Sequence, residues 1–310
     1  MFLTITPNAC VDRVLFIDRF VAETTMRTRK AVDSVGGKGF DVSVALRCMG
    51  QETLAVGFKA GAVGAALAAL VGSYGIQTDL VEVPGETRIA HVIVEEALRR
   101  HSHVTTRGYS VSPAAYDSLL DRIRSHLSRC AWVYAGGSLP EGMPEDCCQT
   151  ITRLAHEHGK PVLLDVSGSP AWLALPSRPE ILKMNRQEFQ ATFDKNPASM
   201  DELAEAAATL AAARGLSAFV ITCGRDGILA VTSQGTTLTW GPQMQEVNAA
   251  GAGDAASAAL MWRLSQGDDW SQSLRWAAAA GAATLLTEAT AESDLQTIKE
   301  LLTQIEQKQF

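Results

Sequence analysis

Short apolar runs of strand length alternate along this chain with segments of helical character, and this alternation limits the possible folds most. Parallel strands need a crossover between them, usually a helix, before the next strand can pair in the same direction. Strands buried on both faces read as continuous apolar runs. Such runs occupy residues 2–6, 53–58, 131–136, 161–166, 180–185 and 217–224. We therefore predict a three-layer α/β/α domain with a central, mostly parallel sheet.

Helical patterns fill the intervals between these runs. The predicted helices span residues 42–50, 113–127, 201–215, 276–287 and 294–307. Residues 60–78 carry no charge, but four glycines interrupt the segment. We expect these residues to form a helix packed on the sheet rather than a membrane span, because no aromatic belt flanks them.

Two segments, about 11–35 and 86–107, alternate apolar and polar residues and have strand character instead. Strands that expose one face and interrupt an α/β core need covering, so we expect a small β-sheet lid or an association surface. The chain shows no internal repeat. We predict a single domain over residues 1–310 that carries this lid and pairs with a second copy through it.

The formal net charge is -7. General nucleic-acid or anionic-membrane binding needs a broad cationic field, so neither is expected here. The six cysteines form no C-x-x-C pair, and the first ten residues lack the basic start and apolar run of a signal peptide. These features favour a reduced, cytoplasmic protein in which any anionic ligand is held by local groups.

In open α/β sheets, ligands bind beyond the carboxyl ends of the strands. Glycine-rich or polar stretches follow the apolar runs at nearly every such junction. They occupy residues 6–12, 136–142, 165–170, 183–188, 222–227 and 248–254. Turns alone favour these residue types, but six at equivalent places indicate a ligand site.

The stretch 247-VNAAGAGDAASAALMW-262 puts glycine-rich backbone and a single carboxylate, Asp254, at the start of an apolar helix. Unpaired amides at a helix N-terminus bind anions, and glycine leaves room for one. Asp254 is then either an ordinary helix cap or a general base that takes a proton from a hydroxyl during phosphoryl transfer. Neither a P-loop nor a G-x-G-x-x-G dinucleotide motif is present.

A second glycine-rich turn surrounds Lys38 and leads into a helix that carries Asp41. Such a turn can be no more than a turn, or it can present donors to a ligand. Arg27 and Arg88 fall on the two predicted lid segments, where they could close over a phosphorylated ligand. His101 and His103 are interpreted as surface residues, because a spacing of two separates side chains on a helix.

The chain resembles the PfkB-type carbohydrate kinases of the ribokinase-like superfamily over almost its full length. Both signatures of that family are present, G-G-K-G at residues 36–39 and G-A-G-D at residues 251–254. The segments at 7–12, 136–142, 165–168, 183–188 and 222–227 are further similar to the branch that contains 1-phosphofructokinase and tagatose-6-phosphate kinase. The resemblance implies a ribokinase-like fold, ATP with Mg²⁺, and fructose 1-phosphate, fructose 6-phosphate or tagatose 6-phosphate as substrate.

The resemblance also implies site residues. Asp254 would be the catalytic base and the backbone of Gly251, Ala252 and Gly253 the anion hole. The sugar phosphate would contact Asp12, Arg27, Gly37, Lys38, Asp41, Arg88 and Ser138. ATP would lie against Lys183, Asn185, Thr222, Gly224 and Gly227, with Glu188 organising Mg²⁺.

One departure concerns the substrate directly. The family commonly has Asn where this chain has Asp41, and a carboxylate only accepts hydrogen bonds and adds negative charge. Two other functions stay open: a kinase for an unphosphorylated sugar or nucleoside, and a sugar-binding regulator without turnover. A nicotinamide dehydrogenase is disfavoured because the dinucleotide motif is missing.

Overall fold

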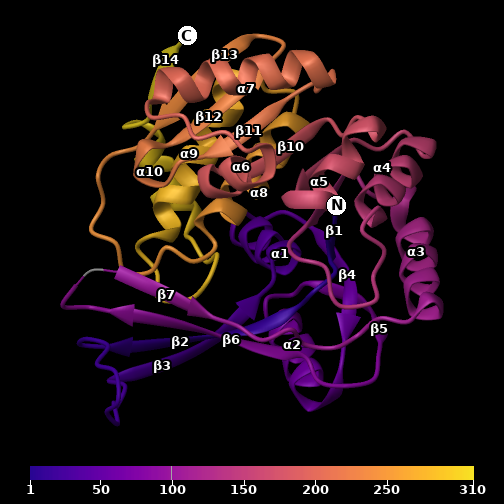
Figure 1. Ribbon diagram of the computed structural model, residues 1–310, viewed down its shortest axis with the longest axis vertical. Helices are drawn as coiled ribbons and strands as arrows, with labels where there is room; N and C mark the ends of the chain where they lie inside the picture. The colour runs from indigo at the N-terminus through magenta and orange to yellow at the C-terminus, as the bar shows by residue number, and fades with distance from the viewer. Residues whose placement is uncertain (99) are drawn as a thin grey trace.

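The computed structural model describes residues 1–98 and 100–310 and contains two sheets (Figure 1). The large sheet has ten strands in the order β14-β13-β12-β11-β10-β9-β8-β1-β4-β5. Its parallel part consists of β1 (Phe2–Thr6), β4 (Thr53–Lys59), β5 (Gln77–Glu82), β8 (Trp132–Gly136), β9 (Val162–Asp165), β10 (Ile181–Asn185) and β11 (Phe219–Thr222). The antiparallel part consists of β12 (Ile228–Thr232), β13 (Gly235–Trp240) and β14 (Glu306–Gln309).

Helices cover both faces of this sheet, as the two main hydrophobic clusters show. One face packs against α3 (Pro113–Leu127), α4 (Cys147–Glu157), α5 (Gly168–Ala174), α6 (Arg186–Phe193) and α7 (Met200–Arg214). The other packs against α1 (Lys38–Cys48), α8 (Ala252–Ser265), α9 (Trp270–Thr284) and α10 (Leu295–Leu302). The predicted three-layer α/β class is therefore confirmed.

The second sheet has four strands in the order β3-β2-β6-β7 and extends away from the helical layers (Figure 1). Its strands are β2 (Cys10–Ile17), β3 (Lys30–Gly36), β6 (Arg88–Glu95) and β7 (Arg100–Val104). They come from the segments 11–35 and 86–107, which were predicted as strands from their alternating apolar and polar residues. Residue 99 lies outside the described residues. Helix α2 (Gly61–Ser73) packs beside this sheet, with Leu67 and Val71 meeting Val11 and Val35. We call these four strands the small sheet.

Two predicted helices end five residues earlier than expected, at Ser73 instead of 78 and at Leu302 instead of 307. The uncharged segment 60–78 becomes α2 only to Ser73, and Gln77 already belongs to the edge strand β5. Helix α10 ends at Leu302 and the polar residues Glu306–Gln309 pair with β13. The free edge of β13 supplies the backbone partners of β14. The side chains of β14 show no strand pattern, so this strand could not be predicted. Within the described residues, no helix has the length and apolarity needed to cross a membrane.

Candidate active site

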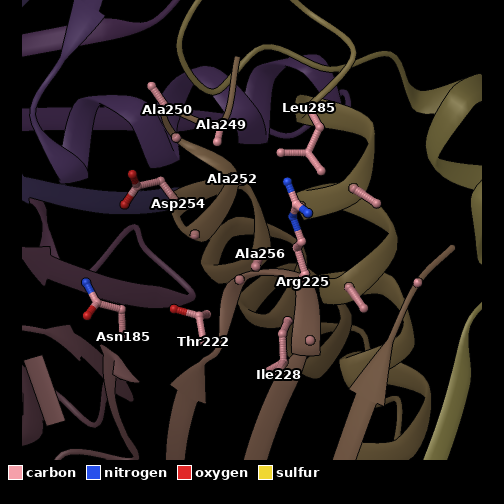
Figure 2. Close-up of a pocket in the computed structure, with 18 of the residues that line it drawn as sticks. Asn185, Thr222, Arg225, Ile228, Ala249, Ala250, Ala252, Asp254, Ala256 and Leu285 are labelled. Atoms are coloured by element: carbon pink, nitrogen blue, oxygen red, sulfur yellow. The ribbon is translucent and has the colours of Figure 1, made fainter. Parts of the chain in front are cut away.

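Two adjoining cavities open where the parallel strands of the large sheet end. The larger has a volume of about 610 Å³ and reaches from β10 and β11 to α8 and α9 (Figure 2). The smaller, about 380 Å³, lies between the small sheet, the start of α1 and the loop after β8. Six residues line both cavities: Lys38, His103, Glu188, Ala250, Gly251 and Asp254. A group held in one cavity can therefore meet a group held in the other beside Asp254.

Helix α8 begins at this junction. Its N-cap residue is Gly251, with a φ of 80°, and a Cβ there would lie 2.3 Å from the backbone nitrogen of Ala291. Only glycine fits such a position. The cap uses no side chain, so the interpretation of Asp254 as the helix cap is wrong. Among the described residues, the amides of Gly251 and Gly253 have no hydrogen-bond acceptor, and they remain free for an anion.

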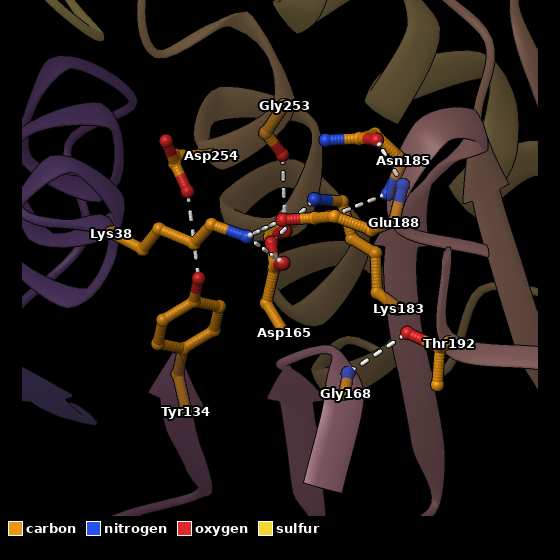
Figure 3. A network of polar contacts seen from close by, with 11 residues as sticks. Lys38, Tyr134, Asp165, Gly168, Lys183, Asn185, Glu188, Thr192, Gly253 and Asp254 are labelled. Carbon is orange, nitrogen blue, oxygen red and sulfur yellow. Dashed lines mark hydrogen bonds and ion pairs between the residues drawn. The ribbon is translucent and has the colours of Figure 1, made fainter. Parts of the chain in front are cut away.

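Asp254 lies in the first turn of α8, and the Tyr134 hydroxyl donates to its Oδ1 over 3.4 Å (Figure 3). Burial raises the pKa of Asp254 to about 7, and the charge of Asp165 adds to the shift. Lys183 and Lys38 oppose it. A carboxylate with a pKa near neutrality can both accept a proton during a reaction and release it afterwards.

A buried ionic network lies beside Asp254 (Figure 3). Asp165, at the end of β9, accepts from Lys38 Nζ over 2.6 Å and from Lys183 Nζ over 2.5 Å. Burial disfavours the charge on Asp165, but the two ammonium groups outweigh it and lower its pKa to about 2. Glu188 accepts from Lys38 over 3.1 Å and from the backbone N–H of Asn185, with which it forms the capping box at the start of α6. Two lysines are thus held facing the junction.

The smaller cavity has acidic side chains on its walls. Asp12 of β2 accepts from the Thr290 hydroxyl over 3.3 Å. Asp41 of α1 is only 4% exposed, and its Oδ1 has no partner among the described residues. Burial raises the pKa of Asp41 well above its usual range, and the charges of Asp254 and Asp12 add to this. Burial therefore favours the neutral form of Asp41, and a neutral carboxyl can donate a hydrogen bond as well as accept one.

Arg88 begins β6 and lines the smaller cavity together with Gly37 and Ser138. Its guanidinium donates to the carbonyl of Asn8 over 3.1 Å and also contacts the hydroxyl of Thr105, while its Nε is buried without a partner among the described residues. Arg27 differs from Arg88. It lies on the exposed connection between β2 and β3 and lines neither cavity of its own chain.

The larger cavity contains every residue that was assigned to ATP. Its polar wall includes Lys183, Asn185, Thr222, Gly224 and Gly227. Its opposite wall is formed by the alanine-rich faces of α8 and α9 and ends at Leu285 (Figure 2). Small apolar side chains therefore line that wall. Arg225 projects from the 3₁₀ turn Gly224–Asp226 toward Leu285.

Several residues of the site were missed in the sequence. Asp165 and Tyr134 were counted only as parts of apolar runs and turns, and their roles depend on partners distant in the chain. His101 and His103 are exposed, as predicted, but they lie on strand β7 rather than on a helix, and they line the larger cavity. On a strand, a spacing of two puts both side chains on one face. Strand periodicity could have found them.

The model of pfkB family carbohydrate kinases matches residues 5–298. The chain belongs to this family. It is a carbohydrate kinase, a phosphotransferase with an alcohol group as acceptor, and the resemblance seen in its motifs is confirmed. This pfkB kinase is 29% identical over 288 residues to the D-tagatose-1-phosphate kinase of Bacillus licheniformis, covering 93% of each chain.

This kinase is also 30% identical to the 1-phosphofructokinase of Rhodobacter capsulatus, over 89% of this chain and 87% of that one. Among solved structures, a possible 1-phosphofructokinase of Thermotoga maritima superposes with a TM-score of 0.91 at 25% identity. The match covers 100% of this chain and 99% of that one. The ribokinase-like architecture therefore extends over the whole chain.

Proposed function

We propose that this kinase transfers the γ-phosphoryl group of ATP to a hydroxyl of a ketohexose phosphate. One observation carries the proposal: Asp254 lines both cavities, beside unpaired amides at the start of α8. Two relatives are named D-tagatose-1-phosphate kinase and 1-phosphofructokinase, and these names support a phosphorylated ketohexose as the acceptor.

The nucleotide occupies the larger cavity and the sugar the smaller one. Asp254 accepts the proton of the attacking hydroxyl as the new oxygen–phosphorus bond forms and the bond to the β-phosphate oxygen breaks. The amides of Gly251 and Gly253 donate to the oxygens of the transferred group. Lys38 and Lys183, fixed by Asp165, supply positive charge beside it. ADP and the newly phosphorylated sugar then leave, and Asp254 releases its proton.

The residues fit a magnesium ion that is held mainly by phosphate oxygens and water. Among the described residues, no cluster of three or more His, Cys, Asp or Glu side chains could hold a metal on its own. Mg²⁺ commonly needs only one or two carboxylates beside the phosphates of its nucleotide. Both oxygens of Glu188 already accept one hydrogen bond, so Glu188 would orient waters of the ion. The ion itself would neutralise charge on the phosphates.

The smaller cavity offers groups for both parts of a sugar phosphate. Asp12 accepts from sugar hydroxyls, whereas Asp41, whose neutral form is favoured by burial, can in that form donate to one hydroxyl and accept from another. Arg88 offers its unpaired Nε and its charge to the phosphate, with the Ser138 hydroxyl nearby. Arg27 stays a prediction from the resemblance, because it lines neither cavity.

An ADP-release assay with Mg²⁺ tests the proposed function. We expect turnover with fructose 1-phosphate, fructose 6-phosphate, tagatose 1-phosphate or tagatose 6-phosphate, and a kcat/KM at least about 10-fold lower with the matching free ketohexoses. Omission of Mg²⁺ is the control and should abolish turnover. Absence of turnover on every sugar, while a sugar still raises the melting temperature, would favour the sugar-binding regulator.

Arg88→Ala separates phosphorylated from neutral acceptors. We expect this change to raise KM for the sugar phosphate by about 10- to 100-fold, because a charge-assisted contact to the phosphate is lost, and to leave KM for ATP within about twofold. Arg88→Lys should recover part of the loss. Equal KM values for the acceptor in Arg88→Ala and the unmodified enzyme would instead support the second candidate, a kinase for an unphosphorylated sugar or nucleoside.

We also propose that two copies associate through the small sheet. Large apolar side chains are exposed on this sheet and on its connections: Phe20, Val21, Met26, Leu98 and Val104. Such a concentration is typical of a surface that a partner covers. Light scattering should give twice the chain mass, and Val104→Glu should lower it to that of one chain. A single-chain mass for the unmodified protein would rule the dimer out.

A further inference from the structure

Besides its apolar contact with α2, the small sheet makes polar contacts with the rest of the molecule on two sides. Toward the smaller cavity, Thr290 exchanges hydrogen bonds with Ser34 and donates one to Asp12, and Lys30 forms an ion pair with Glu288. Toward the larger cavity, His101 Nδ1 lies 3.4 Å from Glu246 Oε1. Among the described residues, no other polar side-chain contact joins the small sheet to the segment between β13 and α8. In Figure 1, that orange segment descends to the start of β7.

The strand register explains why His101 faces the site. His101 pairs with Val94 and His103 with Val92, and these valines lie opposite Phe16 and Val14 on β2. Because directly paired residues point to the same face of a sheet, both imidazoles share the face that carries Asp12. Their rings meet edge to face, with centroids 5.5 Å apart. His101 thus connects the sugar-facing side of the small sheet to the nucleotide side of the site.

His101 and Glu246 both line the larger cavity, so a nucleotide bound there would cover them. Their side chains are 36% and 32% exposed without one. A polar contact this exposed contributes little, because water competes for both side chains. A nucleotide that excludes this water would strengthen the contact. The side-chain contact between β7 and the segment before α8 therefore becomes stronger when the nucleotide site is filled.

We propose that His101 and Glu246 are positioning residues that couple nucleotide binding to closure of the small sheet over the sugar. The inference rests on the proposed function, which assigns the nucleotide to the larger cavity. Neither residue touches the reacting atoms. Together they hold β7, and with it His103, across the junction where the two cavities meet. By reciprocity, the sugar phosphate strengthens nucleotide binding by the same factor.

Calorimetric titration of the sugar phosphate, with and without a non-hydrolysable ATP analogue and Mg²⁺, tests this coupling. The probe is the panel sugar phosphate with the highest kcat/KM. In the unmodified enzyme, we expect the analogue to strengthen sugar binding. In His101→Gln and in Glu246→Gln, that enhancement should fall by about twofold to fivefold, the range for a partly exposed polar contact. Affinity without the analogue should stay unchanged, and the double variant should match either single variant.

His91→Gln is the matched control, because His91 is on β6 of the same sheet but pairs with Val104 on the opposite face. It should keep the full enhancement. An undiminished enhancement in His101→Gln would overturn the coupling while leaving the kinase function intact. An equal loss of affinity with and without the analogue would show a merely structural role. Absence of phosphoryl transfer to any sugar by the unmodified enzyme would overturn the proposed function, and the coupling with it.

Discussion

Asp254→Asn should lower kcat by about 10²- to 10⁴-fold while the protein stays folded, because the amide keeps the shape of the side chain but cannot take the hydroxyl proton. KM for both substrates should change by less than about threefold, since binding groups elsewhere in the cavities are untouched. Steady-state kinetics with the best sugar of the panel measures both. Asp269 is the matched control, because its carboxylate truly caps a helix, α9, by accepting from the Gln272 amide. Asp269→Asn should retain normal turnover.

The pH dependence gives the same assignment an independent check. Asp254 must be unprotonated to act as a base, and burial raises its pKa to about 7. The kcat/KM of the unmodified enzyme should therefore fall as the pH decreases through about 7 and level off above it. Asp254→Asn should lack this acidic limb. Near-normal kcat in that variant, or the same limb in both enzymes, would show that another group is the base.

Asp165→Ala should lower the free energy of unfolding by about 3–5 kcal/mol, the cost of leaving a buried charge without its partner. Asp165 is 1% exposed and Lys183 is 4% exposed, so water cannot replace the missing carboxylate. Urea unfolding followed by circular dichroism measures the change. Since the two lysines lower the pKa of Asp165 to about 2, its contribution is present at neutral pH and is lost as the pH falls from about 4 toward 2.

The surface pair of Arg13 and Asp33 provides the control for this effect. Its geometry is as good, with Nε and Oδ1 2.6 Å apart, but its side chains are 39% and 46% exposed. Asp33→Ala should therefore cost at most about 1 kcal/mol. If Asp165→Ala cost no more than Asp33→Ala, Lys183 would have found another partner or lost its proton. The network beside Asp254 would then not depend on Asp165.

Elements with a strong internal pattern could be predicted from the sequence, and those that depend on a distant partner could not. Six of the parallel strands are largely apolar runs because both of their faces are buried, and their junctions are glycine-rich because ligands and backbone approach there. The parallel strand β5 was missed, because it lies at the sheet edge and its residues Gln77–Glu82 are mostly polar and partly or fully exposed. Strand β14 has no such pattern, since Glu306–Gln309 gain their partners from the edge of β13. The predicted helix over residues 294–307 was too long for this reason.

The same distinction applies to the site. The glycine-rich start of α8 could be predicted, because glycines at a helix start have a local meaning. Of the three amides assigned to the anion hole, that of Ala252 instead donates to the carbonyl of Ala249, and the roles of Gly251 and Gly253 stay a prediction. Asp165 was not assigned a role, since its two lysines come from residues 38 and 183 and only the fold brings them together. The raised pKa of Asp41 also depends on the fold, because it results from burial beside the carboxyl groups of Asp254 and Asp12.

The direction of the pKa shift at Asp41 changes how this replacement of the common asparagine should be understood. Burial favours the neutral carboxyl, which has one hydroxyl donor and one carbonyl acceptor, much as an amide has donors and an acceptor. The more strongly a site favours the neutral acid, the more alike aspartate and asparagine become as partners for a sugar hydroxyl. Substrate assignments across related kinases should therefore compare the burial of this side chain as well as its identity.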